Sequence, residues 1–179
     1  HPNMNTVPGV DMSTGSLGQG LSAAAGMAKG AKYLGKDLNV YALLGDGELA
    51  EGQIWEAAMF AAHYKLDNLC IIADINGLQI DGRTCDVMNT EPVDAKFAAF
   101  GCDVVKADGH DFDQLEAAFA KFHANRGSGK PTCILMKTTK GKGVSYMEDN
   151  AGWHGKAPND EEYAKGMAEL AEARKALEV

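Results

Sequence analysis

The chain has 179 residues, of which 45% are apolar and 23% are charged, and its formal net charge at pH 7 is −8. This length and composition suit one soluble globular domain with a core of ordinary size. The acidic balance argues against nucleic acid as a partner, because a phosphate backbone requires a basic surface.

Neither a membrane segment nor a secretion signal is visible in the sequence. No apolar run approaches the length that spans a bilayer, so we expect a cytoplasmic protein without a membrane partner. The chain starts at His1 without an initiator Met, and we expect it to be incomplete at its N-terminus. The wide spacing of its cysteines favours reduced thiols, although a disulfide or zinc framework stays open. These cysteines are Cys70, Cys85, Cys102 and Cys133.

The first part of the chain is divided by turn signals and apolar periodicity. The predicted elements are a loop over 1–15, a helix over 16–34, a buried strand over 40–44 and a helix over 51–64. The first helix is rich in small residues, and its glycine-rich start suits an anion or a polar ring edge, although close helix packing explains the glycines equally well. The apolar stripe of the second helix is predicted to contain Ile54, Ala58, Phe60 and Ala61.

The remaining chain continues the alternation of strands and helices. We predict strands over 69–75, 103–106 and 132–136, a turn over 76–82, and helices over 92–100, 111–125 and 159–178. Pro92 suits the first position of its helix, and Asp111 with Gln114 resembles a capping box. Crossovers long enough for helices predict an α/β fold, a parallel sheet with helices on both faces. No internal linker is visible, so residues 1–179 are expected to form a single domain.

Two successive strands of this predicted sheet are each followed by a side chain that carries oxygen. Asp46 lies in the turn Gly45-Asp46-Gly47, and Asn76 follows the next strand. Ligands of open parallel sheets bind at the carboxyl ends of the strands, so we expect these side chains to be neighbours. Their oxygens are hard ligands of the kind that Mg²⁺ or Ca²⁺ prefers, and the glycines let the backbone approach a bulky anion. A metal-bridged diphosphate site is therefore the hypothesis, although each feature alone is more often a turn or a cap.

The histidines are the other candidates for chemistry. His1 and His154 lie in loops flanked by Pro or Gly, where an imidazole can transfer protons near neutral pH. His63 and His123 lie in predicted helices and are assigned no chemistry. His110 lies beside a helix start, and we interpret it as a hydrogen-bonding partner of a loop.

Several motifs follow one another in a recognisable order. They are His1-Pro2, residues 14–20 (Thr-Gly-Ser-Leu-Gly-Gln-Gly), residues 45–52 (Gly-Asp-Gly-Glu-Leu-Ala-Glu-Gly), Trp55-Glu56-Ala57, Asn76 and Trp153-His154-Gly155. Together they resemble the thiamine diphosphate-binding, N-terminal part of transketolases, over nearly the whole chain. The loop over 140–148 is most similar to the loop of split transketolases, in which two chains make up the enzyme.

The resemblance implies a role for the residues at the strand ends. Asp46, Asn76 and the backbone carbonyl of Leu78 would bind Mg²⁺ or Ca²⁺, and the metal would bridge the diphosphate of thiamine diphosphate. Gly45 and Gly47 would leave room for the diphosphate oxygens.

Further roles are implied for residues on the surrounding loops. Additional cofactor contacts would come from Gly15, Ser16, Leu17, Leu78 and Ile80. Glu51 would take part in a carboxylate link across a subunit interface. His1 and His154 would face the substrate and assist proton transfers. The implied reaction moves a two-carbon ketol unit from a ketose phosphate to an aldose phosphate, as in the pentose phosphate pathway.

The resemblance also implies a partner, because the acid that activates the aminopyrimidine belongs to a separate pyrimidine-binding domain or C-terminal subunit. We therefore expect an inactive isolated chain and a homo- or hetero-oligomeric enzyme, such as a dimer. Deoxyxylulose-phosphate synthase is the nearest rival, since it shares the Gly-Asp-Gly site and a similar Lys-Gly-Lys-Gly loop. Another alternative is a non-catalytic fragment that binds the cofactor or serves in assembly.

Overall fold

The computed structural model describes residues 2–177 and contains a four-stranded sheet in the order β1-β2-β6-β5. Its strands are β1 (Val40–Gly45), β2 (Leu69–Ile75), β5 (Asp103–Asp108) and β6 (Thr132–Lys137). All neighbouring strands are parallel, which confirms the predicted strands and their direction. β6 is inserted between β2 and β5, an order that the sequence does not predict.

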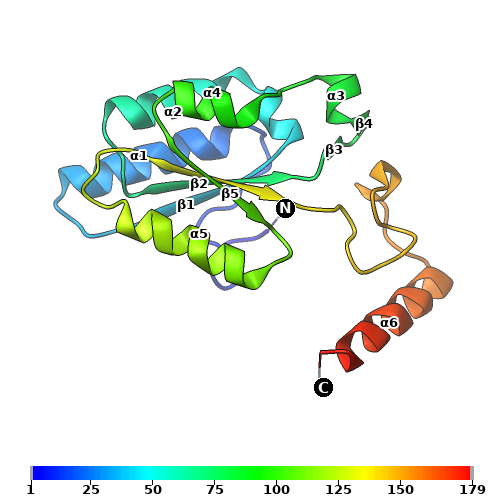
Figure 1. Cartoon of the computed structure of the whole chain (residues 1–179). Coiled ribbons are helices and arrows are strands. Elements are labelled where there is room, and N and C mark those ends of the chain that lie inside the picture. Colours follow the sequence, from blue (N-terminus) through cyan, green and yellow to red (C-terminus); the bar gives the residue numbers. More distant parts are fainter. Residues whose placement is uncertain (1, 178–179) are drawn as a thin grey trace.

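Helices cover both faces of this sheet, as predicted (Figure 1). One face carries α1 (Gln19–Tyr33), α2 (Gly52–His63) and α4 (Val93–Ala99). The other face carries α5 (Phe112–Ala124), which packs on β5, β6 and part of β2. The carboxyl ends of the strands therefore open on one edge, where the loops that follow them meet.

The buried face of α2 differs at one residue from the predicted apolar stripe. Ile54, Ala58 and Ala61 are fully buried, but Phe60 is 39% exposed and packs on Tyr64 instead, with ring centroids 4.5 Å apart. Phe60 lies six residues after Ile54, which rotates its side chain by about 240° around the helix axis. It therefore cannot share the buried face with Ile54.

Two predicted helix starts also differ in detail. α1 begins at Gln19 and not at residue 16, because Gly18 has a φ of 84° and ends the preceding turn outside the helical region. Asp111 caps α5 by accepting hydrogen bonds from the backbone N–H groups of Asp113 and Gln114. The predicted capping box is incomplete, since the Gln114 Oε1 accepts from the backbone N–H of Asp108 and not from that of Asp111.

Short elements lie at the carboxyl edge of the sheet. They are η1 (Gly47–Ala50), β3 (Leu78–Gln79), β4 (Gly82–Arg83), α3 (Thr84–Val87) and η2 (Ala151–Trp153). β3 and β4 form an antiparallel hairpin inside the segment predicted as a turn. Its strands are too short to leave a periodic signal in the sequence.

The C-terminal helix α6 (Asp160–Lys175) lies apart from the layered part of the molecule (Figure 1). It packs on the loop that follows β6, where the Tyr146 hydroxyl donates to the carbonyl of Glu162 at 2.5 Å and Ser145 donates to Glu169. Gly166 is buried in this contact, because a Cβ at this position would lie only 2.9 Å from the hydroxyl oxygen of Tyr146. Within residues 2–177, no helix is long and apolar enough to cross a bilayer.

The cysteines are free thiols. Cys70, Cys102 and Cys133 are buried, and burial raises the pKa of Cys70 and of Cys102 to about 12. The described part of the chain holds no cluster of His, Cys, Asp and Glu that could bind a metal. The cysteines are therefore unpaired in this structure, and a zinc framework finds no support among the described residues.

Candidate metal and diphosphate site

Asp46 lies directly after β1, and its carboxylate extends into the turn after β2. The backbone N–H of Asp46 donates to the carbonyl of Asp74 at 3.2 Å, which continues the ladder between the two strands. Its Oδ1 accepts from the N–H of Gly47 at 2.9 Å, and its Oδ2 accepts from the N–H of Gly77 at 2.5 Å. These bonds fix the carboxylate between the two turns.

Asn76 occupies the second of these turns, one residue before Gly77. Its Oδ1 accepts from the N–H of Leu78 at 2.9 Å, and its Nδ2 donates to Asp74 Oδ1 at 3.3 Å. The structure therefore brings Asp46 and Asn76 together, as the strand-end argument predicts, and it places the backbone of Leu78, which the resemblance implies as a ligand, beside Asn76. Their oxygens come from a carboxylate, an amide and a carbonyl, which is the donor chemistry of Mg²⁺ and Ca²⁺ sites.

The environment of Asp46 leaves its negative charge uncompensated. The residue is 4% exposed, and none of the ion pairs among residues 2–177 includes it. Burial raises the pKa of Asp46, hydrogen bonds from Gly77 and Gly47 oppose this shift, and the nearby charge of Asp74 adds to it. A buried carboxylate without a cation is costly, so the site fits a divalent cation.

The two glycines beside Asp46 differ in what surrounds them. A Cβ on Gly45 would meet nothing within 4 Å, so the space beside it is open. A Cβ on Gly47 would lie 2.9 Å from the Cβ of Gln79, so this glycine lets the β3–β4 hairpin approach. The Gln79 Oε1 is buried and has no hydrogen-bond partner in the described part of the chain. An unsatisfied oxygen acceptor thus lies beside the site.

Glu48 joins the loop before α1 to this site, a role that is absent from the predictions made on the sequence. Its Oε1 accepts from the N–H of Gly18 at 2.8 Å, and its Oε2 accepts from the N–H of Gly45 at 3.1 Å. A Cβ on Gly18 would approach Glu51 and Gln53 within 2.9 Å, so the loop packs closely on the start of α2. Glu48 lies inside the motif over 45–52, and this position is the sequence feature that could have indicated its role.

Apart from Leu78 on β3, the cofactor contacts predicted around the strand ends lie on exposed loops. Gly15 and Ser16 line an open hollow of about 510 Å³ in front of α1. Leu17 and Ile80 are 56% and 65% exposed, whereas the side chain of Leu78 is buried. Exposed apolar side chains are available to an aromatic ligand ring, and their contact with a cofactor stays a prediction.

His154 lies at the end of η2, in the long loop after β6. Its side chain is exposed, and its backbone N–H donates to the carbonyl of Ala151 at 2.9 Å. The ring of the preceding Trp153 packs on Tyr146, with centroids 5.1 Å apart. The structure therefore places His154 on a different loop from Asp46 and Asn76, and its predicted catalytic role stays a prediction.

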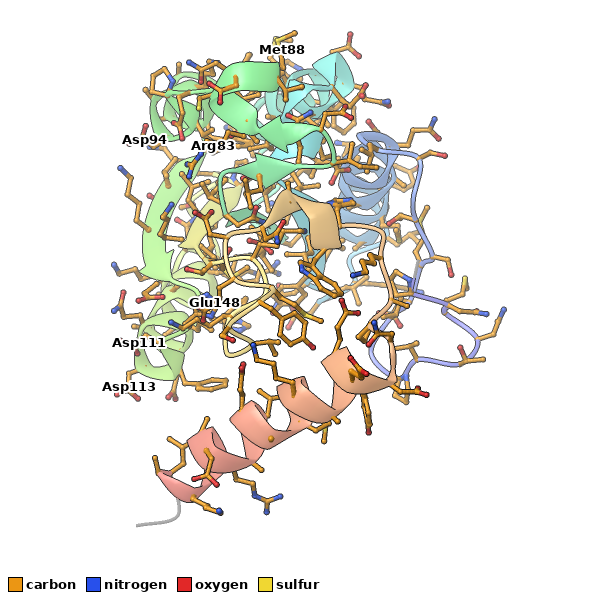
Figure 2. The ribbon with its side chains drawn as sticks, turned by 90° about the vertical axis from the view of Figure 1, so that its right-hand side faces the viewer. Arg83, Met88, Asp94, Asp111, Asp113 and Glu148 are labelled. Atoms are coloured by element: carbon orange, nitrogen blue, oxygen red, sulfur yellow. The ribbon has the colours of Figure 1, made fainter. Side chains whose placement is uncertain are left out.

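The loop that carries His154 is tied to the hairpin beside the metal site. Arg83 of the hairpin pairs with Asp149 at 3.3 Å. Figure 2 shows this loop, marked by Glu148, between the hairpin and α6. His1, the other predicted catalytic residue, lies outside the described residues.

The remaining histidines have local roles. The Nε2 of His110 accepts from the backbone N–H of Thr139 at 2.8 Å, which confirms the predicted hydrogen bond with a loop. His63 and His123 lie in α2 and α5, as expected.

Comparison with known proteins agrees with this geometry. Residues 1–177 match the family model described as transketolase, thiamine diphosphate binding domain. The chain belongs to this transketolase family. A transketolase from Campylobacter jejuni superposes with a TM-score of 0.85 at 35% identity, over 96% of this chain and 27% of that one. The parallel sheet with flanking helices is therefore the transketolase fold of this domain.

Two similar proteins are named as transketolase subunits. The chain is 44% identical over 170 residues to a subunit of the apulose-4-phosphate transketolase of Actinobacillus succinogenes, covering 95% of this chain and 60% of that subunit. It is also 44% identical over 170 residues to the 6-deoxy-6-sulfo-D-fructose transketolase subunit SqwG of a Clostridium species, covering 95% and 61%. The chain thus spans about 60% of the length of either relative. These names favour a transketolase over deoxyxylulose-phosphate synthase.

Proposed function

We propose that this chain is the metal- and diphosphate-binding part of a transketolase that uses thiamine diphosphate and Mg²⁺. The enzyme would transfer a two-carbon ketol unit from a ketose phosphate to an aldose phosphate. One observation carries the proposal. The buried carboxylate of Asp46 has no cationic partner among residues 2–177 and lies beside Asn76 at the ends of two parallel strands. A divalent cation bound to a diphosphate would supply the missing charge.

Each residue of the site then has a task. Asp46, Asn76 and the Leu78 carbonyl would hold the metal, and the open side of Gly45 would accommodate phosphate oxygens. When bound, thiamine diphosphate supplies the chemistry that breaks and forms carbon–carbon bonds. The exposed imidazole of His154 would move a proton at a substrate hydroxyl, because histidine is the side chain that most often serves in general acid–base catalysis.

A second polypeptide or domain would complete the enzyme. Both relatives named above are subunits, which supports a pyrimidine-binding partner and a hetero-oligomer for this chain. One relative is named for a phosphorylated sugar and the other for a sulfonated sugar, so the substrates would be sugars that carry an anionic group. A cytoplasmic location stays part of the proposal.

The proposal is tested by expressing the chain together with its partner and assaying ketol transfer from xylulose 5-phosphate. Activity should require both chains, thiamine diphosphate and a divalent cation, and Asp46→Ala should abolish it. In the same complex, His154→Ala should lower turnover about 100-fold or more while cofactor affinity changes little. Transfer by the isolated chain, or full activity of the Asp46→Ala complex, would contradict the proposal.

A further inference from the structure

The carboxylate of Asp74, on β2, lies next to the amide of Asn76 and is not one of the proposed metal ligands. Its Oδ1 accepts hydrogen bonds from Asn76 Nδ2 at 3.3 Å and from the hydroxyl of Thr138. Asp74 is partly buried, and no ion pair of the described residues includes it. Its observed partners therefore belong to the site and to the loop after β6.

These contacts decide which end of the Asn76 amide is turned toward Leu78. A carboxylate oxygen can only accept a hydrogen bond, so the group facing Asp74 must be the NH₂ of Asn76. The backbone N–H of Leu78 can only donate, so the group facing it must be Oδ1. Both neighbours require the same orientation, which leaves the second lone pair of Oδ1 free for a cation.

Thr138, the first residue after β6, in turn holds Asp74. Its backbone N–H donates to the carbonyl of Ile75 at 3.2 Å, which extends the pairing of β2 with β6 by one residue. The residue fits closely against Gly109, where a Cβ would lie 2.5 Å from the Thr138 methyl group. The next residue, Thr139, is held by His110. The position of the Thr138 hydroxyl is therefore fixed by two adjacent loops.

We propose that Asp74 is a positioning residue for the metal ligand Asn76, and that Thr138 fixes Asp74 in this role. The inference rests on the proposed metal site and extends it. Hydrogen-bonding partners behind a metal ligand commonly set its orientation, and their removal typically weakens metal binding by about 10- to 100-fold. Asp74 and Thr138 are 64 residues apart, so the contact exists only in the folded sheet.

The test is calorimetric titration of Mg²⁺ into the complex of this chain with its partner, at saturating thiamine diphosphate. Asp74→Ala should weaken Mg²⁺ binding by about 10- to 100-fold, and Thr138→Val by about tenfold. Thr138→Ser keeps the hydroxyl and should restore binding to within about twofold of the unchanged chain. Asp103→Ala, at the opposite end of the sheet on β5, makes the same substitution at an exposed position and serves as the matched control.

Thr138→Val separates orientation from charge, because it leaves the Asp74 carboxylate in place. Loss of affinity in Thr138→Val together with recovery in Thr138→Ser supports the positioning role. Unchanged affinity in both Asp74→Ala and Thr138→Val, in a complex that loses Mg²⁺ binding on Asp46→Ala, would overturn the inference while the proposed function stands. If Asp46→Ala also binds Mg²⁺ normally, the proposed metal site fails and the inference falls with it. Thermal unfolding of each variant shows whether a loss of binding reflects a loss of fold.

Discussion

Asp46 and Asp67 are both buried aspartates, 4% and 5% exposed, but they lie at opposite ends of the sheet. Asp67 precedes β2 at its amino end and pairs with Lys32 at 2.6 Å. It also accepts from the N–H groups of Gly127 and Gly129 at 2.9 and 3.0 Å. Asp46 follows β1 at its carboxyl end and has backbone hydrogen bonds but no ion pair within the described residues.

The two carboxylates also differ in the direction in which the fold shifts their pKa values. Burial alone would raise the pKa of Asp67, but the hydrogen bond from Lys32 and those from Gly129 and Gly127 lower it below its usual value. Burial raises the pKa of Asp46, since its hydrogen bonds compensate only in part. The charge of Asp67 is thus neutralised by the fold itself, whereas the charge of Asp46 would be neutralised by the proposed metal ion. The comparison separates a residue that stabilises the fold from a residue that serves the site.

The largest expected effect concerns binding and distinguishes the two aspartates directly. In the complex with the partner, Asp46→Asn should weaken Mg²⁺-dependent binding of thiamine diphosphate by at least about 100-fold, because Mg²⁺ depends on a carboxylate ligand. Asp67→Asn makes the same chemical change far from the site and should leave the affinity within about twofold of the unchanged chain. Calorimetry with and without Mg²⁺ measures both. Equal losses in the two variants would remove the distinction.

The second prediction concerns stability, where Asp67→Asn should have a larger effect than Asp46→Asn. Asp67→Asn should lower the free energy of unfolding by about 2–3 kcal/mol, because it removes the ion pair with Lys32 and replaces charge-assisted hydrogen bonds with neutral ones. Asp46→Asn should cost less than about 1 kcal/mol in metal-free buffer, since it also removes a buried, uncompensated charge. Urea unfolding of both variants against the unchanged chain provides the measurement. A larger loss in Asp46→Asn would show that Asp46 serves the fold.

The smallest expected effect is a pH dependence that belongs to Asp67. Because its pKa is lower in the folded chain than the unfolded value of about 3.9, its contribution is fully present above that value. The contribution is lost as the pH falls through the folded pKa. The stability difference between the unchanged chain and Asp67→Asn should therefore shrink as the pH is lowered from about 6 to about 3. A difference that stays constant over this range would assign the effect to packing.

Much of the fold could be predicted because it follows from local patterns. Apolar runs such as residues 69–75 indicated the strands, and their alternation with helices indicated the parallel sheet. Asp46 and Asn76 could be predicted as neighbours because consecutive strands placed them at one edge of the sheet. Apolar character alone predicts the wrong face of α2 for Phe60, because it does not fix the position of a side chain around the helix.

The contacts that support the site could not be predicted, because they depend on the strand order. Asp74 meets Thr138 only because β6 lies beside β2, with Asp74 opposite Met136. Glu48 contacts Gly18 across 30 residues because the loop before α1 and the end of β1 meet in space. Neither contact leaves a periodic or compositional signal in the chain. The sequence thus indicates the ligands, and the fold indicates what orients them.

The most direct test of the metal site is a crystal structure of the complex with thiamine diphosphate and Mn²⁺, which replaces Mg²⁺ and scatters anomalously. We expect one anomalous peak within about 2.3 Å of a carboxylate oxygen of Asp46, the Oδ1 of Asn76 and the carbonyl oxygen of Leu78. The Asp67 carboxylate should show no peak and should keep its pairing with Lys32. A cofactor bound with its metal on other residues, or an Asp46 carboxylate paired with a cationic side chain of the partner, would contradict the account.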